Sequence, residues 1–153
     1  MHVKDVMTPD PRVCSPATNL AEAAELMLDA DCGILPVVEH GKLVGVVTDR
    51  DLYIALATRD RRASELTVGE VARRDVLTCE PDDDVRSVLG IMRSHRVRRL
   101  PVEGFGGTVV GIVSLNDLLL AAGSHKPLRA EEVLGTLQTI CAHHHPAPHV
   151  TAA

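Results

Sequence analysis

The stretch Gly45-Val-Val-Thr-Asp-Arg-Asp51 ends an apolar run, and it recurs later in the chain as Gly111-Ile-Val-Ser-Leu-Asn-Asp117. The apolar residues around each glycine predict a buried strand, and Thr48 and Ser114 stand where a helix would begin. Each hydroxyl residue is followed three positions later by an aspartate, which is the spacing of a capping box. We therefore predict a strand-turn-helix corner in each copy.

The same corner suits a ligand. A helix start presents unpaired N–H groups and a partial positive charge, both of which favour phosphate. The aspartate beside it, Asp51 or Asp117, is able to accept hydrogen bonds from two ribose hydroxyls. Capping and ligand binding are compatible, so the sequence supports both roles at once.

The chain contains an internal repeat, because separate features return at one constant offset. Val3-Lys-Asp-Val6 matches Val68-Gly-Glu-Val71, and Leu35-Pro-Val37 matches Leu100-Pro-Val102. Between them, apolar residues at helical spacing recur in both copies: Leu20, Ala23, Ala24 and Met27, then Val85, Val88, Leu89 and Met92. The second copy gains one residue, which we place in the hairpin turn at 104–107. The predicted order in each copy is strand, helix, strand, strand, helix.

One copy is too small to cover its own sheet, so the two copies are expected to pack on each other. The predicted fold is α/β (α+β), with two β-α-β-β-α repeats in pseudo-two-fold symmetry and a C-terminal helix. We assign residues 1–62 to the first repeat and 63–122 to the second. Residues 123–153 form the helix, expected at 128–142, and a His/Pro-rich tail. Residues 58–67 are polar and predict a linker.

Composition excludes several classes of protein. The net charge of -5 and the near absence of aromatic residues, with only Tyr53, Phe105 and no Trp, argue against nucleic-acid binding. No segment has the apolar length of a membrane span or a signal peptide. We expect a cytoplasmic protein without nucleic-acid or membrane partners.

The four cysteines, Cys14, Cys32, Cys79 and Cys141, are too few and too scattered for a disulfide framework. We expect three of them to be small core residues. Cys141 lies in the predicted C-terminal helix, where it either pairs with a cysteine such as Cys14 or fills a gap in the helix interface. Free thiols are favoured.

The segment Arg93-Ser-His-Arg-Val-Arg-Arg99 is a local cationic patch, since four of its seven residues are arginine. Strand alternation would place Arg99 with Val97, and Arg98 on the opposite side with Arg96. Arginine engages phosphate with two donors at once, so the patch favours phosphorylated ligands over S-adenosylmethionine. The first repeat has glycine and isoleucine at the matching positions, which predicts two unequal sites.

Pro36 and Pro101 lie inside the predicted strands. Because proline cannot donate to a sheet ladder, each is expected at a strand edge or a strand end. Neighbouring backbone groups would then be available to bind a flat heterocycle, with Leu35, Val37 and their repeat partners as apolar walls. An ordinary edge strand explains the prolines equally well.

These motifs together resemble the cystathionine-β-synthase (CBS) domain pair, also called a Bateman module. The matching segments in the first copy are Val3-Lys-Asp-Val-Met7, Leu35-Pro-Val-Val38 and Gly45–Asp51, and in the second Val68-Gly-Glu-Val71, His95-Arg-Val-Arg-Arg-Leu-Pro-Val102 and Gly111–Asp117. The resemblance covers about residues 1–122. Stand-alone CBS pairs of the actinobacterial hypoxic-response type are similar too, including a final helix with a cysteine.

The resemblance implies a regulatory module, and no enzyme, that binds AMP, ADP, ATP or S-adenosylmethionine in clefts between the repeats. Asp51 and Asp117 would hold ribose, Thr48 and Ser114 would meet phosphate, and backbone at 34–36 and 99–101 would contact adenine. The expected nucleotide-binding residues are Ile34, Leu35, Pro36, Thr48, Arg50, Asp51, Arg98, Arg99, Leu100, Pro101, Ser114, Asn116 and Asp117. No prosthetic group is expected, and Mg²⁺ at most as a companion of the nucleotide. A homodimer and a separate, unnamed protein target are also implied.

A second hypothesis is a redox- or metal-responsive structural protein with vestigial clefts. In it, Cys141 and the tail histidines His143, His144, His145 and His149 would do the sensing, with zinc or nickel as the metal. Adjacent histidines among prolines are more typical of a solvated tail. No catalytic triad, Cys-His pair or metal-ligand motif stands out from the repeat.

Overall fold

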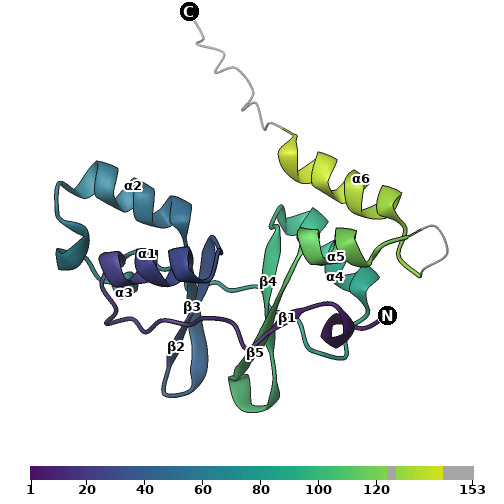
Figure 1. Cartoon of the computed structure of the whole chain (residues 1–153), viewed down its shortest axis with the longest axis horizontal. Coiled ribbons are helices and arrows are strands. Elements are labelled where there is room, and N and C mark those ends of the chain that lie inside the picture. The colour runs from purple at the N-terminus through teal and green to yellow at the C-terminus, as the bar shows by residue number, and fades with distance from the viewer. Residues whose placement is uncertain (124–126, 143–153) are drawn as a thin grey trace, which may run out of the picture.

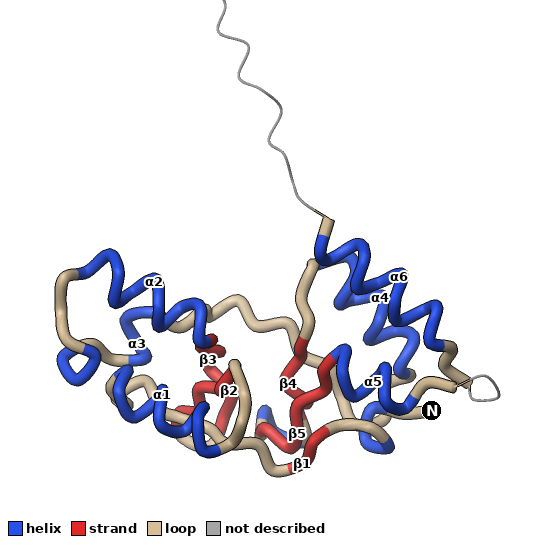
Figure 2. Tube along the Cα trace, turned by 45° about the horizontal axis from the view of Figure 1, so that its top comes forward, coloured by secondary structure: helices blue, strands red, loops and turns tan. Residues whose placement is uncertain are grey.

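The computed structural model describes residues 1–123 and 127–142. In this part of the chain two similar halves lie side by side, with their strands toward the middle and helices outside (Figure 1). A second view shows the strands between the two groups of helices (Figure 2). The predicted α+β class and the tandem arrangement are confirmed.

The first half is built mainly from the first repeat. Helix α1 covers Leu20–Asp29, strand β2 Ile34–Glu39, strand β3 Lys42–Thr48 and helix α2 Asp49–Arg59. Helix α1 begins where the Asn19 side chain accepts a hydrogen bond from a backbone amide of the first turn. Strands β2 and β3 form an antiparallel hairpin against which the helices pack.

The second half repeats this order. Helix α4 covers Val85–His95, strand β4 Arg99–Glu103, strand β5 Val109–Ser114 and helix α5 Leu115–Ala121. A short 3₁₀ turn, η3 (Phe105–Gly107), joins the two strands. Val37 pairs with Gly45 in the first hairpin, and Val102 pairs with Gly111 in the second. The extra residue of the second copy therefore lies in this hairpin, as predicted.

The leading segments of the two repeats are exchanged between the halves. The first repeat begins with a 3₁₀ turn, η1 (Val3–Asp5), and a two-residue strand, β1 (Thr8–Pro9), and β1 pairs with β5 of the second repeat. The second repeat begins with helix α3 (Val68–Val71), after which Arg73 forms a bridge with Val46 of the first. The strand expected at the head of each repeat is reduced to two residues in the first repeat and to a single bridge in the second, and each of them pairs with the opposite half.

Each half has its own aliphatic core, and each core contains side chains from both repeats. Val3 is fully buried in the core of the second half, while Leu66 and Val68 are fully buried in the core of the first. The range 58–67, expected as a polar linker, holds the end of α2, a 3₁₀ turn, η2 (Ala63–Glu65), and the buried Leu66. Because the cores are shared, the pair is the folding unit.

Gly45 and Gly111 lie where the exchanged segments cross the hairpins. A Cβ on Gly45 would come within 2.9 Å of the Arg73 carbonyl oxygen, and one on Gly111 within 3.1 Å of the Thr8 carbonyl oxygen. Val46 and Arg73 exchange backbone hydrogen bonds of 3.0 and 2.9 Å beside the first contact. The repeated glycine is therefore required by close backbone approach.

Helix α6 covers Ala130–Cys141, close to the predicted range, and it packs on α4 and α5 (Figure 1). Leu128 and Val133 attach it to the core of the second half, where both are buried. No helix within residues 1–123 and 127–142 has the length and apolarity to cross a bilayer.

We expect Gly45→Ala to destabilise the protein by about 1–3 kcal/mol, since the new methyl group would press on the Arg73 backbone carbonyl. Urea unfolding followed by circular dichroism measures this change. The control is Gly90→Ala on the exposed side of α4, where a Cβ meets nothing within 4 Å and the substitution should add up to about 1 kcal/mol of stability. Equal stability of Gly45→Ala and wild type would contradict the role assigned to the exchange.

We also expect two of the four cysteines to resist labelling in the native state. Burial raises the pKa of the Cys14 thiol to about 11 and that of Cys79 to about 12, so at pH 8 neither supplies reactive thiolate. Maleimide labelling followed by peptide mass spectrometry should modify the exposed Cys141 and, more slowly, Cys32. All four should react in urea, and rapid native labelling of Cys14 or Cys79 would show that the cores are misassigned.

Candidate functional site

Both predicted helix-start corners form as capping boxes. Thr48 donates from N and Oγ1 to Asp51 Oδ2 over 3.0 and 2.7 Å, and its hydroxyl accepts from Asp51 N over 3.2 Å. Ser114 and Asp117 repeat these three contacts at 2.8, 2.7 and 3.2 Å. Oδ2 is thereby committed to the cap, so Oδ1 is the oxygen of each aspartate that the cap leaves unused.

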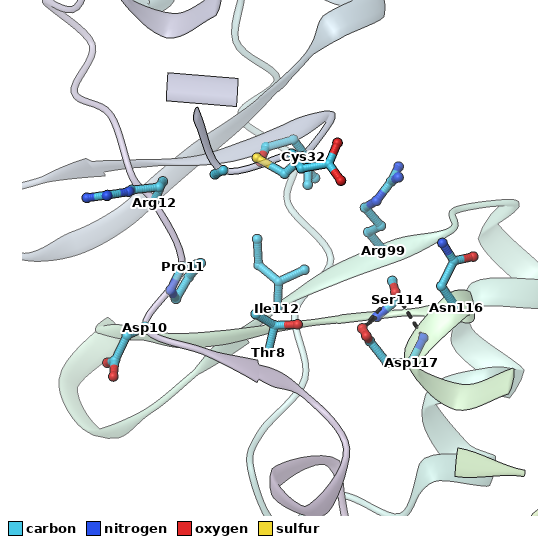
Figure 3. A pocket seen from close by; sticks show the side chains of 13 residues that line it. Thr8, Asp10, Pro11, Arg12, Cys32, Arg99, Ile112, Ser114, Asn116 and Asp117 are labelled. Carbon is cyan, nitrogen blue, oxygen red and sulfur yellow. Dashed lines mark hydrogen bonds between the residues drawn. The ribbon is translucent and has the colours of Figure 1, made fainter. Parts of the chain in front are cut away.

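One cleft of about 410 Å³, here called the Ser114 cleft, lies beside the second corner. Its walls come from both repeats: Ser114, Asn116, Asp117 and Arg99 from the second, and Thr8, Cys32 and Ile34 from the first. Figure 3 shows the bonded Ser114–Asp117 pair at one end, with Thr8 and Ile112 beside it and Cys32 across the opening.

A second cleft of about 500 Å³, the Thr48 cleft, lies beside the first corner. Five arginines line it, Arg50, Arg73, Arg96, Arg98 and Arg99, together with two aspartates, Asp49 and Asp75. The Ser114 cleft instead has two arginines, Arg12 and Arg99, and three aspartates, Asp10, Asp31 and Asp117. The clefts therefore differ in charge, as the uneven arginine run of the sequence predicts.

Ile34 and Arg99 occupy equivalent positions at the start of β2 and β4, and each of them lines both clefts. Ile34 is buried, whereas Arg99 is exposed. The apolar walls expected from Leu35 and Val37 do not form, because both side chains are fully buried in the first core. Strand alternation turns them toward the helices, and of the neighbouring residues of β2 Ile34 lines the clefts. In β4, Leu100 and Pro101 line the Thr48 cleft.

Pro36 and Pro101 lie within strands that end their sheets, in agreement with the expectation of edge positions. Their carbonyl oxygens accept hydrogen bonds from Cys14 N over 3.0 Å and from Cys79 N over 3.2 Å. These bridges occupy the outer side of each strand. The backbone groups that can meet a heterocycle are accordingly fewer than the prolines alone suggest.

The arginine run is not a strand, and the alternation expected for it is wrong before Arg99. Helix α4 continues to His95, the backbone turns through Arg96 with a left-handed φ of 56°, and β4 begins only at Arg99. A helix end followed by a turn resets the direction of each side chain. Sequence alternation holds only within one continuous strand.

Arg96 and Arg98 instead contact the end of α6. Arg96 Nη2 donates to the carbonyl oxygens of Thr139 and Ala142, each over 3.1 Å, and Arg98 Nη2 lies 3.5 Å from Cys141 Sγ. The last carbonyls of a helix carry partial negative charge, which a guanidinium satisfies. These contacts connect the C-terminal helix to the Thr48 cleft.

Sequence reasoning missed Arg73 as a site residue. Its Nε and Nη2 atoms lie 3.3 and 3.1 Å from Asp51 Oδ1, the oxygen that the cap leaves unused. The residue at the equivalent position of the other cleft is Thr8. The equivalence of Thr8 and Arg73 could have been read from the sequence repeat, because each residue follows its matched segment, 3–6 or 68–71, at the same distance.

The described cysteines are free thiols, as the sequence favours. Cys14 and Cys79 are buried core residues, as expected. Cys32 is half-buried, since it packs against the first core and also lines the Ser114 cleft. The candidate metal ligands His143, His144, His145 and His149 lie outside the described residues. Within the described residues no three His, Cys, Asp or Glu side chains gather to hold a metal.

Comparison with known proteins identifies the family. Residues 3–58 and 68–124 each match the family model described as the CBS domain. The CBS domain-containing protein YhcV of Bacillus subtilis is 37% identical over 116 residues, which cover 76% of this chain and 81% of YhcV. The two matches correspond to the two repeats found in the sequence.

Comparison with solved structures points to the same family. Hypoxic Response Protein I, determined with two coordinated zinc ions, is 28% identical with a TM-score of 0.72, covering 83% of this chain and 100% of that one. The CBS domain pair of MJ0100, in complex with 5′-methylthioadenosine and S-adenosyl-L-methionine, is 32% identical with a TM-score of 0.68 (77% and 92% covered). CBSX2 in complex with AMP is 28% identical with a TM-score of 0.67 (78% and 94% covered). The chain belongs to the CBS-domain family, as a tandem pair of CBS repeats.

Proposed function

We propose that this chain is a non-catalytic regulatory module that binds an adenosine-containing ligand between its CBS repeats, and that it prefers AMP, ADP or ATP to S-adenosylmethionine. The observation that carries the proposal is the Ser114 cleft, where a capped aspartate at a helix start lines a cavity of about 410 Å³. Such a cavity lies in the range of small-molecule sites.

The parts of the ligand match the walls of the cleft. The remaining oxygen of Asp117 suits the hydroxyls of a ribose, because a carboxylate oxygen accepts more than one hydrogen bond. Ile34 and Ile112 offer apolar surface to a flat purine. The amides at the start of α5 and the guanidinium of Arg99 suit a 5′-phosphate.

The preference for phosphorylated ligands rests on charge. Two arginines, Arg12 and Arg99, line the Ser114 cleft. A sulfonium ligand such as S-adenosylmethionine brings no phosphate for these groups to bind. The complexes of MJ0100 and CBSX2 support an adenosine-containing ligand in general, one with sulfur-bearing adenosines and the other with AMP.

We also propose a homodimer. Tyr53 and Ile54 on α2 are 72% and 43% exposed, and the equivalent residues Leu119 and Leu120 on α5 are 49% and 83% exposed. Large apolar side chains gathered at matched positions of two helices are typical of an interaction surface. A second copy of the chain would cover both helices at once.

Asp117→Asn should weaken AMP binding at least tenfold, because the amide oxygen is used by the cap and the NH₂ group cannot accept from a ribose hydroxyl. Isothermal calorimetry with adenosine, AMP, ADP, ATP and S-adenosylmethionine, with and without Mg²⁺, measures the affinities. The control is Asp84→Asn, which changes the N-cap of α4 away from both clefts. Absence of heat with every ligand would sink the proposal, as would full affinity in Asp117→Asn.

The dimer is tested by light scattering. The wild type should show twice the chain mass of 16.4 kDa, and the double variant Ile54→Glu with Leu120→Glu should show the single mass, because buried charge opposes association. Leu28→Glu on α1, where the leucine is 80% exposed, is the matched control and should remain dimeric. A monomeric wild type at micromolar concentration would rule this interface out.

A further inference from the structure

An ion pair between Arg73 and Asp51 lies at the Thr48 cleft, and the Ser114 cleft has no equivalent pair among the described residues. Arg73 places Nε and Nη2 at 3.3 and 3.1 Å from Asp51 Oδ1, while Asp51 Oδ2 accepts from Thr48 N and Oγ1 at 3.0 and 2.7 Å. Both oxygens of this carboxylate therefore already have donors. The Asp51 side chain is only 10% exposed, so its carboxylate is shielded from solvent, whereas the Arg73 side chain is 62% exposed.

Backbone contacts fix Arg73 in this place. Its N–H donates to the Val46 carbonyl over 2.9 Å, and its carbonyl accepts from Val46 N over 3.0 Å. Arg73 is thereby paired with strand β3, which leads to the Thr48 corner. Thr8 has the same position in the other half, paired with Ile112 on the strand that leads to Ser114. The two sites can thus be compared residue by residue.

Asp117 differs from Asp51 in the hydrogen-bond partners of its carboxylate. Its Oδ2 accepts from Ser114 N and Oγ, but no side chain among the described residues donates to Oδ1. Thr8 is too short to reach it as an arginine does, although it lies beside Asp117 on the wall of the cleft (Figure 3). Asp117 lines its cleft, whereas the Thr48 cleft is lined by Arg73 and not by Asp51.

We propose that Arg73 closes the Thr48 cleft to ribose, so that each chain binds one adenosine ligand, in the Ser114 cleft. This inference rests on the proposed function, because it assumes that the capped aspartate holds the ribose. Arg73 then determines which of the two equivalent clefts binds the adenosine ligand. Thr8, at the matched position, leaves Asp117 Oδ1 in the Ser114 cleft available to ribose.

The inference is tested by exchanging the two residues. Calorimetry with adenosine, which has no phosphate to attract the arginines, should give one site per wild-type chain. Arg73→Thr should give two sites, because Asp51 Oδ1 is released for ribose. Thr8→Arg should weaken binding at the Ser114 cleft at least tenfold, since an arginine at this position would pair with Asp117. Arg74→Thr, a neighbouring exposed arginine that lines neither cleft, is the charge-matched control and should keep one site.

Cys32 supplies a readout that distinguishes the clefts, since it lines the Ser114 cleft and not the Thr48 cleft. Saturating adenosine should protect it from maleimide in the wild type and in Arg73→Thr, and protection should be lost in Thr8→Arg. Thermal melting without ligand shows whether each variant is folded.

The outcomes separate the two proposals. Two sites of equal affinity in the wild type, or a single site in a folded Arg73→Thr, would overturn the role of Arg73 and leave adenosine binding intact. No binding of adenosine or AMP to the wild type or to Arg73→Thr would remove the proposed function and this inference together.

Discussion

The close approach of each hairpin to the leading segment of the opposite repeat is the contact on which the rest of the structure depends. It is possible only because Gly45 and Gly111 have no side chain toward the carbonyls of Arg73 and Thr8. The contact brings the two halves together through the backbone, while the crossing segments carry different side chains at the matched positions, Arg73 and Thr8. Arg73 pairs with the aspartate of the first corner, and Thr8 lines the cleft beside the second.

The clefts follow from the same exchange. Each corner is capped within its own repeat, while the wall facing it comes from the other, with Ile34 and Arg99 shared by both clefts. A ligand bound in the Ser114 cleft would contact both repeats, so its binding would depend on their relative position. The cores that support the clefts also mix residues of the two repeats, which couples the two halves of the module.

Local and periodic features were predictable from the sequence. The caps at Thr48 and Ser114, the hairpins and the helices depend on spacing within a few residues, and duplication made each signal visible twice. The exchange was not predictable, because the apolar pattern of Val3 or Val68 fits either core equally well. The position of Cys32 on a cleft wall and the pairing of Arg73 with Asp51 depend on that exchange, so they could not be derived from one repeat alone.

The C-terminal helix α6 contacts residues that line the Thr48 cleft. Arg96 Nη2 donates to the carbonyls of Thr139 and Ala142, and Ile140 from the same helix lines the cleft. The N–H groups of Nη2 that bind these helix-end carbonyls are not available to an anion in the cleft at the same time. The position of α6 therefore bears on one of the five arginines that line this cleft, which links the element outside the repeats to the electrostatics inside them.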